Sequence, residues 1–156
     1  MGSLAIPSEL HFVKGIDPVA DMNNGTVYSD IIEVGGEGIM FLYYKGVSTG
    51  GTDNATITVE ASSTTAAAAT AAVPFWYKVV ATTDSGWTAA TTAGFSITAG
   101  SSGLYLIAAP KDVFASTGYL YARLKCLEVT NDPIVGCVLA CVYGLRYSPQ
   151  PASLID

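Results

Sequence analysis

The residues that could do chemistry in this chain are few, and the single histidine limits them most. A Ser-His-Asp or Cys-His site needs an imidazole that the fold holds beside the nucleophile. His11 is the only histidine of the chain, and it stands beside Phe12 in an N-terminal stretch without a sustained period. We interpret His11 as an ordinary surface or contact residue, so the sequence does not predict nucleophilic catalysis.

Carboxylates give a second candidate chemistry, glycoside hydrolysis, which needs two of them on either side of a cleft. Glu33, Glu37 and Glu60 could be placed in that way, but their spacing is that of solvated faces and loops. Residues 21–25, DMNNG, begin like a calcium loop but lack its downstream acidic ligand. The pair Gly50-Gly51 is not followed by the GK[ST] of a phosphate loop. The sequence therefore predicts no enzyme, no cofactor and no metal site.

The three cysteines are interpreted as structural. Cys137 and Cys141 lie four residues apart, which is about 13 Å along a strand and too far for a disulfide. If Val129 pairs with Ile134 across a turn, Cys126 faces Cys137, and a cross-strand disulfide becomes a candidate. Buried free thiols are the favoured interpretation. A zinc site is rejected, because the only histidine is far away in sequence.

Three aromatic residues, Trp76, Tyr77 and Trp87, fall within one predicted hairpin. Exposed aromatic side chains on a β-sandwich can stack on sugar rings, as they do in carbohydrate-binding modules. More often one tryptophan belongs to the core while another covers an edge or an interface. Sugar binding is kept as an alternative function.

The composition favours a protein that is covered by other subunits. Only 13% of the residues are charged whereas 50% are hydrophobic, and the usual charged fraction is about a quarter. So few charges leave little to keep a free surface soluble. The seven Lys and Arg residues are scattered and the net charge is −6, which argues against nucleic acid and against an anionic membrane as partners. The N-terminus lacks the basic and apolar regions of a secretory signal, so we expect synthesis in the cytoplasm.

The elements that would position these residues are short strands, organised around the stretch from Gly118 to Pro149. Its first run alternates apolar with polar residues, and its second run, from Ile134 to Tyr147, is apolar on both faces. The turn formers Thr130-Asn131-Asp132-Pro133 separate the two runs. This pattern predicts a long central β-hairpin, whose second strand is buried on both sides.

Eight or nine short strands with regular turn signals predict an all-β domain, which is either a β-sandwich, with a jelly roll as one form of it, or a closed barrel. The predicted organisation is an extended N-terminal arm (1–25), a β-sandwich domain (26–149) and a C-terminal tail (150–156). The other predicted strands are Thr26–Val34, Gly38–Lys45, Ala55–Ala61, a hairpin over 74–92 and a second pair over 94–109, followed by a helical turn at 110–116.

Several motifs within residues 26–147 occur together in one known group of proteins. They are a TVEA strand, a PFWY strand, a W-T-A hairpin, a T-x-x-x-GF-x-I-T-x-G segment and a YxxxRLKxxEVxNDPxxGxVLA stretch. In this combination the chain resembles small structural proteins of tailed bacteriophages. The resemblance implies a virion component, best placed as a head decoration (cement) protein that binds the outer capsid lattice.

We therefore expect a non-enzymatic protein of the virion surface that stabilises the capsid. The expected partners are the major capsid protein and further copies of the chain, with a trimer as one candidate. Alternatives are a carbohydrate-binding module on a host-facing fibre and a tail or head-completion component. Candidate assembly contacts are the apolar residues Ile6, Leu10, Phe12, Ile16, Trp76 and Trp87.

Overall fold

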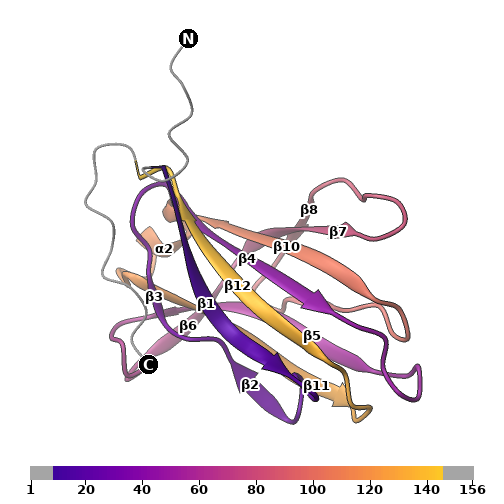
Figure 1. Ribbon diagram of the computed structural model, residues 1–156. Coiled ribbons are helices and arrows are strands. Elements are labelled where there is room, and N and C mark those ends of the chain that lie inside the picture. The colour runs from indigo at the N-terminus through magenta and orange to yellow at the C-terminus, as the bar shows by residue number, and fades with distance from the viewer. Residues whose placement is uncertain (1–8, 146–156) are drawn as a thin grey trace.

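The protein is a sandwich of two antiparallel β-sheets (Figure 1). The computed structural model describes residues 9–145. Sheet A contains, in spatial order, β1 (Leu10–Val19), β12 (Gly136–Tyr143), β4 (Gly38–Lys45), β10 (Gly103–Pro110), β7 (Phe75–Val80) and β8 (Thr88–Ala90). Sheet B contains β2 (Thr26–Tyr28), β11 (Tyr121–Thr130), β5 (Asn54–Ser62) and β6 (Thr70–Val73), with β3 (Ile32–Glu33) beside β11 and β9 (Phe95–Ser96) beside β5. The predicted all-β sandwich is confirmed, and the predicted helical turn is α2 (Lys111–Ala115).

The core lies between the sheets and is made by alternate residues of their central strands. On β4 the side chains of Ile39, Phe41 and Tyr43 are fully buried, and on β11 those of Ala122 and Leu124 are. Successive side chains of a strand point to opposite faces, so a period of two places these residues on one face. Complete burial of a large apolar side chain contributes about 1.5–3 kcal/mol, and the sum over both sheets holds the sandwich together.

The prediction of a central hairpin between Gly118 and Pro149 is wrong, because β11 and β12 belong to different sheets. The chain between them crosses the edge of the sandwich instead of folding back. Its backbone bonds to other segments: the Ile134 carbonyl accepts the Met22 N–H at 2.9 Å, and the Val135 carbonyl accepts the Gly46 N–H at 2.8 Å. Asp132 accepts two further backbone N–H groups from the β4–β5 loop. Turn-forming residues fit such a crossing as well as they fit a hairpin.

The same ambiguity affects the predicted pair over residues 94–109. Both strands form, but β9 pairs with β5 in sheet B whereas β10 pairs with β4 and β7 in sheet A. The loop between them therefore also crosses between the sheets. By contrast, the predicted strands Gly38–Lys45 and Ala55–Ala61 are observed as β4 and β5, and the hairpin over 74–92 is observed as β7 and β8.

Part of the expected N-terminal arm is a strand of the domain. Residues 10–19 form β1, which pairs with β12 along the edge of sheet A, and residues 1–8 lie outside the described part of the chain. The pairing register shifts between Lys14 and Ile16 and again between Ile16 and Val19. Each bulge moves the following side chains to the other face, so the sequence lacks the sustained period by which a strand is recognised. The predicted first strand, Thr26–Val34, is likewise split into β2 and β3.

Candidate assembly surface

The residues considered for catalysis do not converge. His11 lies on β1 opposite Val142, and its Nε2 atom is buried without a hydrogen-bond partner among residues 9–145. Glu60 on β5 is engaged by Arg123, with 2.7 Å between Nη2 and Oε2. Glu33 lies on β3, and Glu37 lies in the turn before β4. Glu60 is thus engaged in ion pairs on sheet B, whereas Glu37 lines a hollow together with Glu9, Leu10 and Gly144.

The most unusual charged group is a buried ion pair between Lys45 and Asp53. The Lys45 Nζ and Asp53 Oδ2 atoms are 2.5 Å apart, and the side chains are 0% and 2% exposed. The second carboxylate oxygen, Oδ1, accepts the backbone N–H of Gly100 at 2.8 Å. Burial alone would raise the pKa of Asp53, but the hydrogen bonds from Lys45 and Gly100 and the charge of Lys45 outweigh it and keep this pKa below its ordinary value. A substrate cannot reach this pair, so we interpret it as a link between the end of β4 in sheet A, the residue that precedes β5 of sheet B, and the β9–β10 loop.

The cysteines are free thiols in the structure. Cys126 points into the core from sheet B, whereas Cys137 lies on the partly exposed face of sheet A. The candidate Cys126–Cys137 disulfide is therefore excluded, because it depended on the hairpin that does not form. Burial raises the pKa of Cys126 to about 12 and also raises that of Cys141.

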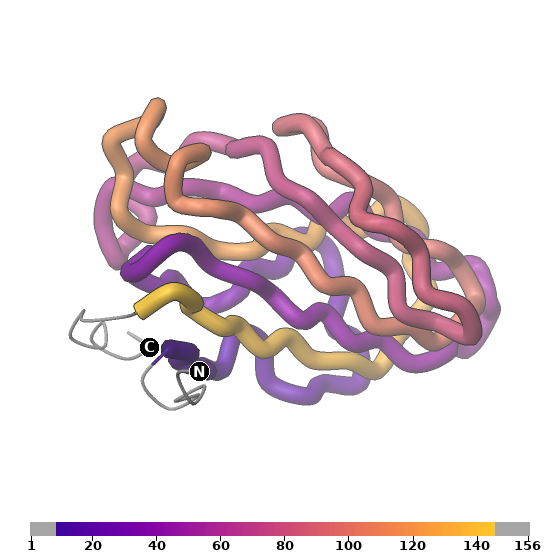
Figure 2. Tube along the Cα trace, turned by 90° about the horizontal axis from the view of Figure 1, so that it is seen from above, coloured from indigo at the N-terminus to yellow at the C-terminus, as the bar shows by residue number. Residues whose placement is uncertain are grey.

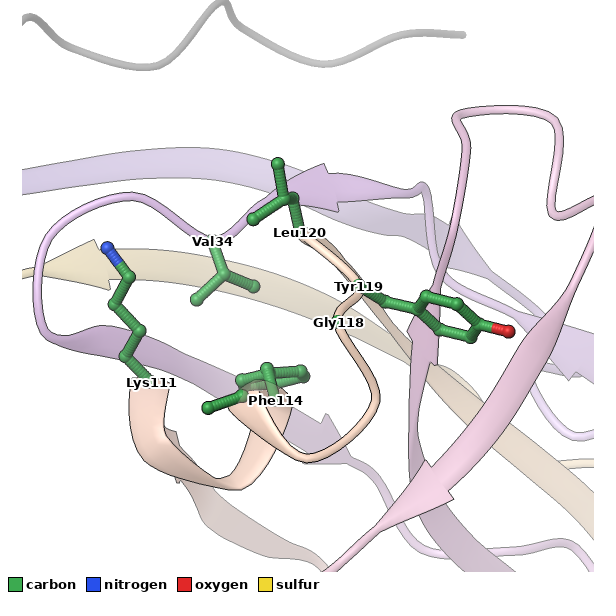
Figure 3. Close-up of a pocket in the computed structure, with 7 residues that line it drawn as sticks. Val34, Lys111, Phe114, Gly118, Tyr119 and Leu120 are labelled. Carbon is green, nitrogen blue, oxygen red and sulfur yellow. The ribbon is translucent and has the colours of Figure 1, made fainter.

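A small apolar pocket lies beside α2, and Figure 3 shows it between Val34, Phe114 and Leu120, with Lys111 at its rim. Its volume is about 130 Å³, room for little more than one apolar side chain. Its lining combines one cationic group with apolar side chains and the phenol of Tyr119. Within residues 9–145 there is also no cluster of three or more His, Cys, Asp or Glu side chains that could hold a metal ion.

The outer face of sheet A, which we call the apolar face, is the most distinctive surface of the described chain. Phe12, Tyr44, Trp76 and Leu139 point away from the core and are 56%, 54%, 41% and 47% exposed. Strand pairing arranges the apolar face in three rows: Phe12–Cys141–Met40–Ala108–Trp76, then Lys14–Leu139–Leu42–Leu106–Lys78, then Cys137–Tyr44–Leu104–Val80. Figures 1 and 2 both show β12 beside β4 and β10 on the other side of β4.

Charge is confined to the edges of this surface. The leucine row ends in Lys14 on β1 and in Lys78 on β7. Each lysine has an acidic neighbour: Lys14 pairs with Asp17 at 3.3 Å, and Lys78 pairs with Asp84 at 2.9 Å. The middle of the face thus offers leucine, methionine and aromatic groups, although Cys141 itself is 0% exposed, and the rim carries neutralised ion pairs.

Sheet B has an ordinary polar exterior. Its outward positions on β5 are Thr56, Thr58 and Glu60, and across from them on β11 lie Leu127, Lys125 and Arg123, so that one exposed leucine stands among polar and charged residues. Antiparallel sheets with one solvated face alternate in this way between apolar and polar residues. Sheet A departs from that rule over five neighbouring strands, which makes its exterior the candidate interaction surface.

The apolar face is large enough to be an interface. With strands about 4.8 Å apart and a residue rise of about 3.4 Å, five strands and three rows spaced by two residues give a planar area of about 500 Å². The largest apolar patch of a typical monomer is about 300–600 Å², and such patches often mark interaction sites. The corrugated surface and its rim approach the ~800 Å² that each partner contributes to a standard interface.

The expected assembly contacts are only partly on this surface. Phe12, Leu10 and Trp76 lie on it, and Trp87 is 51% exposed at the β8 edge. Ile16 instead packs against the core, and Ile6 lies outside the described residues. The sequence interpretation missed Tyr44 and Leu139. The sequence does indicate an apolar outer face, because β4 and β12 are apolar on both sides. An apolar second side was interpreted as buried within the domain, whereas it is exposed at Tyr44 and Leu139.

The aromatic residues considered for sugar binding do not form one platform. The Tyr77 ring stacks on Phe95 inside the sandwich, with 4.0 Å between centroids and 3° between planes. Trp76 and Trp87 remain exposed at the β7–β8 edge of the apolar face.

Comparisons with known proteins add no family: no protein-family model, curated protein or solved structure matches this chain. In the part of the chain that the structure describes, no helix has the length and apolar character to span a membrane.

Proposed function

We propose that this protein is a non-enzymatic structural component of a bacteriophage virion that binds the outer capsid lattice and stabilises it. The observation that carries the assembly role is the apolar face of sheet A, a broad neutral surface suited to burial against another subunit of the particle, either the capsid protein or a further copy of the chain. The choice of a phage virion as the particle rests on the resemblance of the motifs in residues 26–147 to phage structural proteins.

The physical basis of such a function is burial between subunits. Each apolar square ångström removed from water stabilises an assembly by about 25 cal/mol. A rigid sandwich contributes this area without ordering flexible segments, which lowers the entropic cost of association. Stabilising the capsid then requires many bound copies and no chemical reaction.

The test is the copy number of the chain in purified virions of the phage that encodes it, measured by quantitative mass spectrometry against the major capsid protein. A ratio near one, or a simple fraction such as one third, supports lattice decoration. About a dozen copies per particle would favour a tail or head-completion role instead. Absence from virions would refute the proposal.

A second candidate function is carbohydrate binding, favoured by the exposed Trp76 and Trp87 at one edge of sheet A. Tryptophan fluorescence during titration with host surface polysaccharide tests it. A saturable shift that is lost in Trp76→Ala would support sugar binding, and an unchanged spectrum would remove this candidate.

A further inference from the structure

We propose that the apolar face of sheet A binds a second copy of this chain, so that two sandwiches pack sheet A against sheet A around a two-fold axis. The inference rests on the proposed assembly role, and it assigns to the apolar face one partner of defined chemistry. Contacts with a capsid would then use other surfaces of the dimer.

The first argument is the charge of the surface. A copy of the same chain brings the same face, so a charged centre would repel itself, whereas the centre here carries Leu42, Leu106 and Leu139 in one row. Interfaces between identical subunits are also more apolar than interfaces between proteins that associate transiently. The lysines at the ends of this row are each neutralised within their own chain.

The second argument is shape. Suppose that the two-fold axis runs along the leucine row. A residue of the first row in one copy then faces the third-row residue of the same strand in the other copy. On β10 this sets the small Ala108 against Leu104, and on β7 it sets the large Trp76 against Val80. Large side chains thus meet smaller ones on β10 and β7, Met40 meets Tyr44 on β4, and the leucines meet their own copies on the axis.

The third argument is area. Both copies together would bury about twice the planar estimate of 500 Å², and with side-chain corrugation and the rim this reaches the ~1,200–2,000 Å² of specific stable interfaces. Two β-sheets that pack face to face keep their strands within about 30° of one another. Packing sheet A on sheet A would extend the two-layer sandwich of Figure 2 to four layers.

The experiment measures the mass of the purified chain in solution by light scattering and sedimentation equilibrium over a range of concentrations. We expect twice the 16.1 kDa of one chain. Leu139→Lys should raise the dissociation constant at least about 10-fold, because the ammonium group must lose hydration or hold the sheets apart. Tyr44→Glu, on a neighbouring strand of the same face, gives an independent second variant.

The matched control is Leu127→Lys. Leu127 is 43% exposed, close to the 47% of Leu139, but lies on β11 of sheet B. This variant should change the dissociation constant less than about 2-fold, since single exposed substitutions outside an interface are nearly neutral. Circular dichroism confirms that each variant is folded.

The outcomes separate this inference from the proposed function. A monomer throughout the concentration range, a mass of three chains, or a dimer that survives both sheet A variants would overturn the face-to-face pairing. A monomer that is still found in virions at lattice copy number would leave capsid decoration standing. A dimer with the expected response that is absent from virions would refute decoration but keep the pairing.

Discussion

Replacing Asp53 with alanine is expected to destabilise the fold by about 3–5 kcal/mol, because the buried Lys45 ammonium is left without its partner. The pair is enclosed, with both side chains at or below 2% exposure. The variant also removes the acceptor of the Gly100 N–H. Domains of this kind are stable by about 5–15 kcal/mol, so the variant should still fold, with a small margin.

The assay is urea unfolding followed by tryptophan fluorescence. With an m-value of about 2 kcal/mol/M, a loss of 4 kcal/mol lowers the midpoint by about 2 M. The matched control is Asp84→Ala, which breaks the exposed Lys78–Asp84 pair, whose side chains are 24% and 55% exposed. Such a pair contributes about 0.2–1 kcal/mol. A loss below about 1 kcal/mol in Asp53→Ala would refute the reasoning.

A double variant tests the physical cause. If the loss comes from an uncompensated buried charge, adding Lys45→Met to Asp53→Ala should recover at least about 1 kcal/mol, because an apolar side chain of similar length then fills the site. If the double variant is no more stable than Asp53→Ala, the buried charge is not the cause.

Three further predictions concern pH, backbone geometry and thiol reactivity. Folding lowers the pKa of Asp53, so the stabilisation of the fold by its carboxylate is complete above the unfolded pKa of about 3.9 and is lost as the pH falls through the folded pKa. The difference in stability between wild type and Asp53→Ala should therefore shrink in acid titrations below about pH 4. Gly94→Ala should lower the free energy of unfolding in urea by at least about 2 kcal/mol, because the φ of Gly94 is +78° and a Cβ there would lie 2.1 Å from a β5 carbonyl oxygen. Gly51→Ala is the control: Gly51 has a φ of +72° but open space around it, so this variant should cost about 1–2 kcal/mol. Equal losses in the two variants would contradict the steric argument. In native protein at pH 8, a maleimide should leave Cys126, which is buried and has a pKa of about 12, unmodified until unfolding, as peptide mapping would show. Rapid labelling of Cys126 would contradict its burial.

The local elements were predictable because side-chain alternation records which residues of a strand face the core. The bounds of β4 agree with the prediction residue for residue, and β5 differs by one residue at each end. Strand β1 escaped prediction because its two register shifts erase the alternation. Its residues Val13 and Gly15 are nevertheless buried.

The pairing of strands could not be read from the sequence. Thr130-Asn131-Asp132-Pro133 suggested a hairpin, but the Asp132 carboxylate accepts the N–H groups of Gly50 and Thr52, at 2.7 and 2.8 Å, some 80 residues earlier in the chain. A turn signal states that the chain changes direction and says nothing about the sheet that it enters next.

The amino-acid sequence by itself determined the fold class, the positions of most strands and the side of each strand that meets the core, since these follow from local alternation. Only the tertiary structure decided which strands are neighbours. Strand order in turn decides which of the strand sides that point away from the core remain exposed. Backbone hydrogen bonds are the same for every residue type, so strand order is set by long-range packing. That order joins the apolar outward sides of β1, β12, β4, β10 and β7 into one surface.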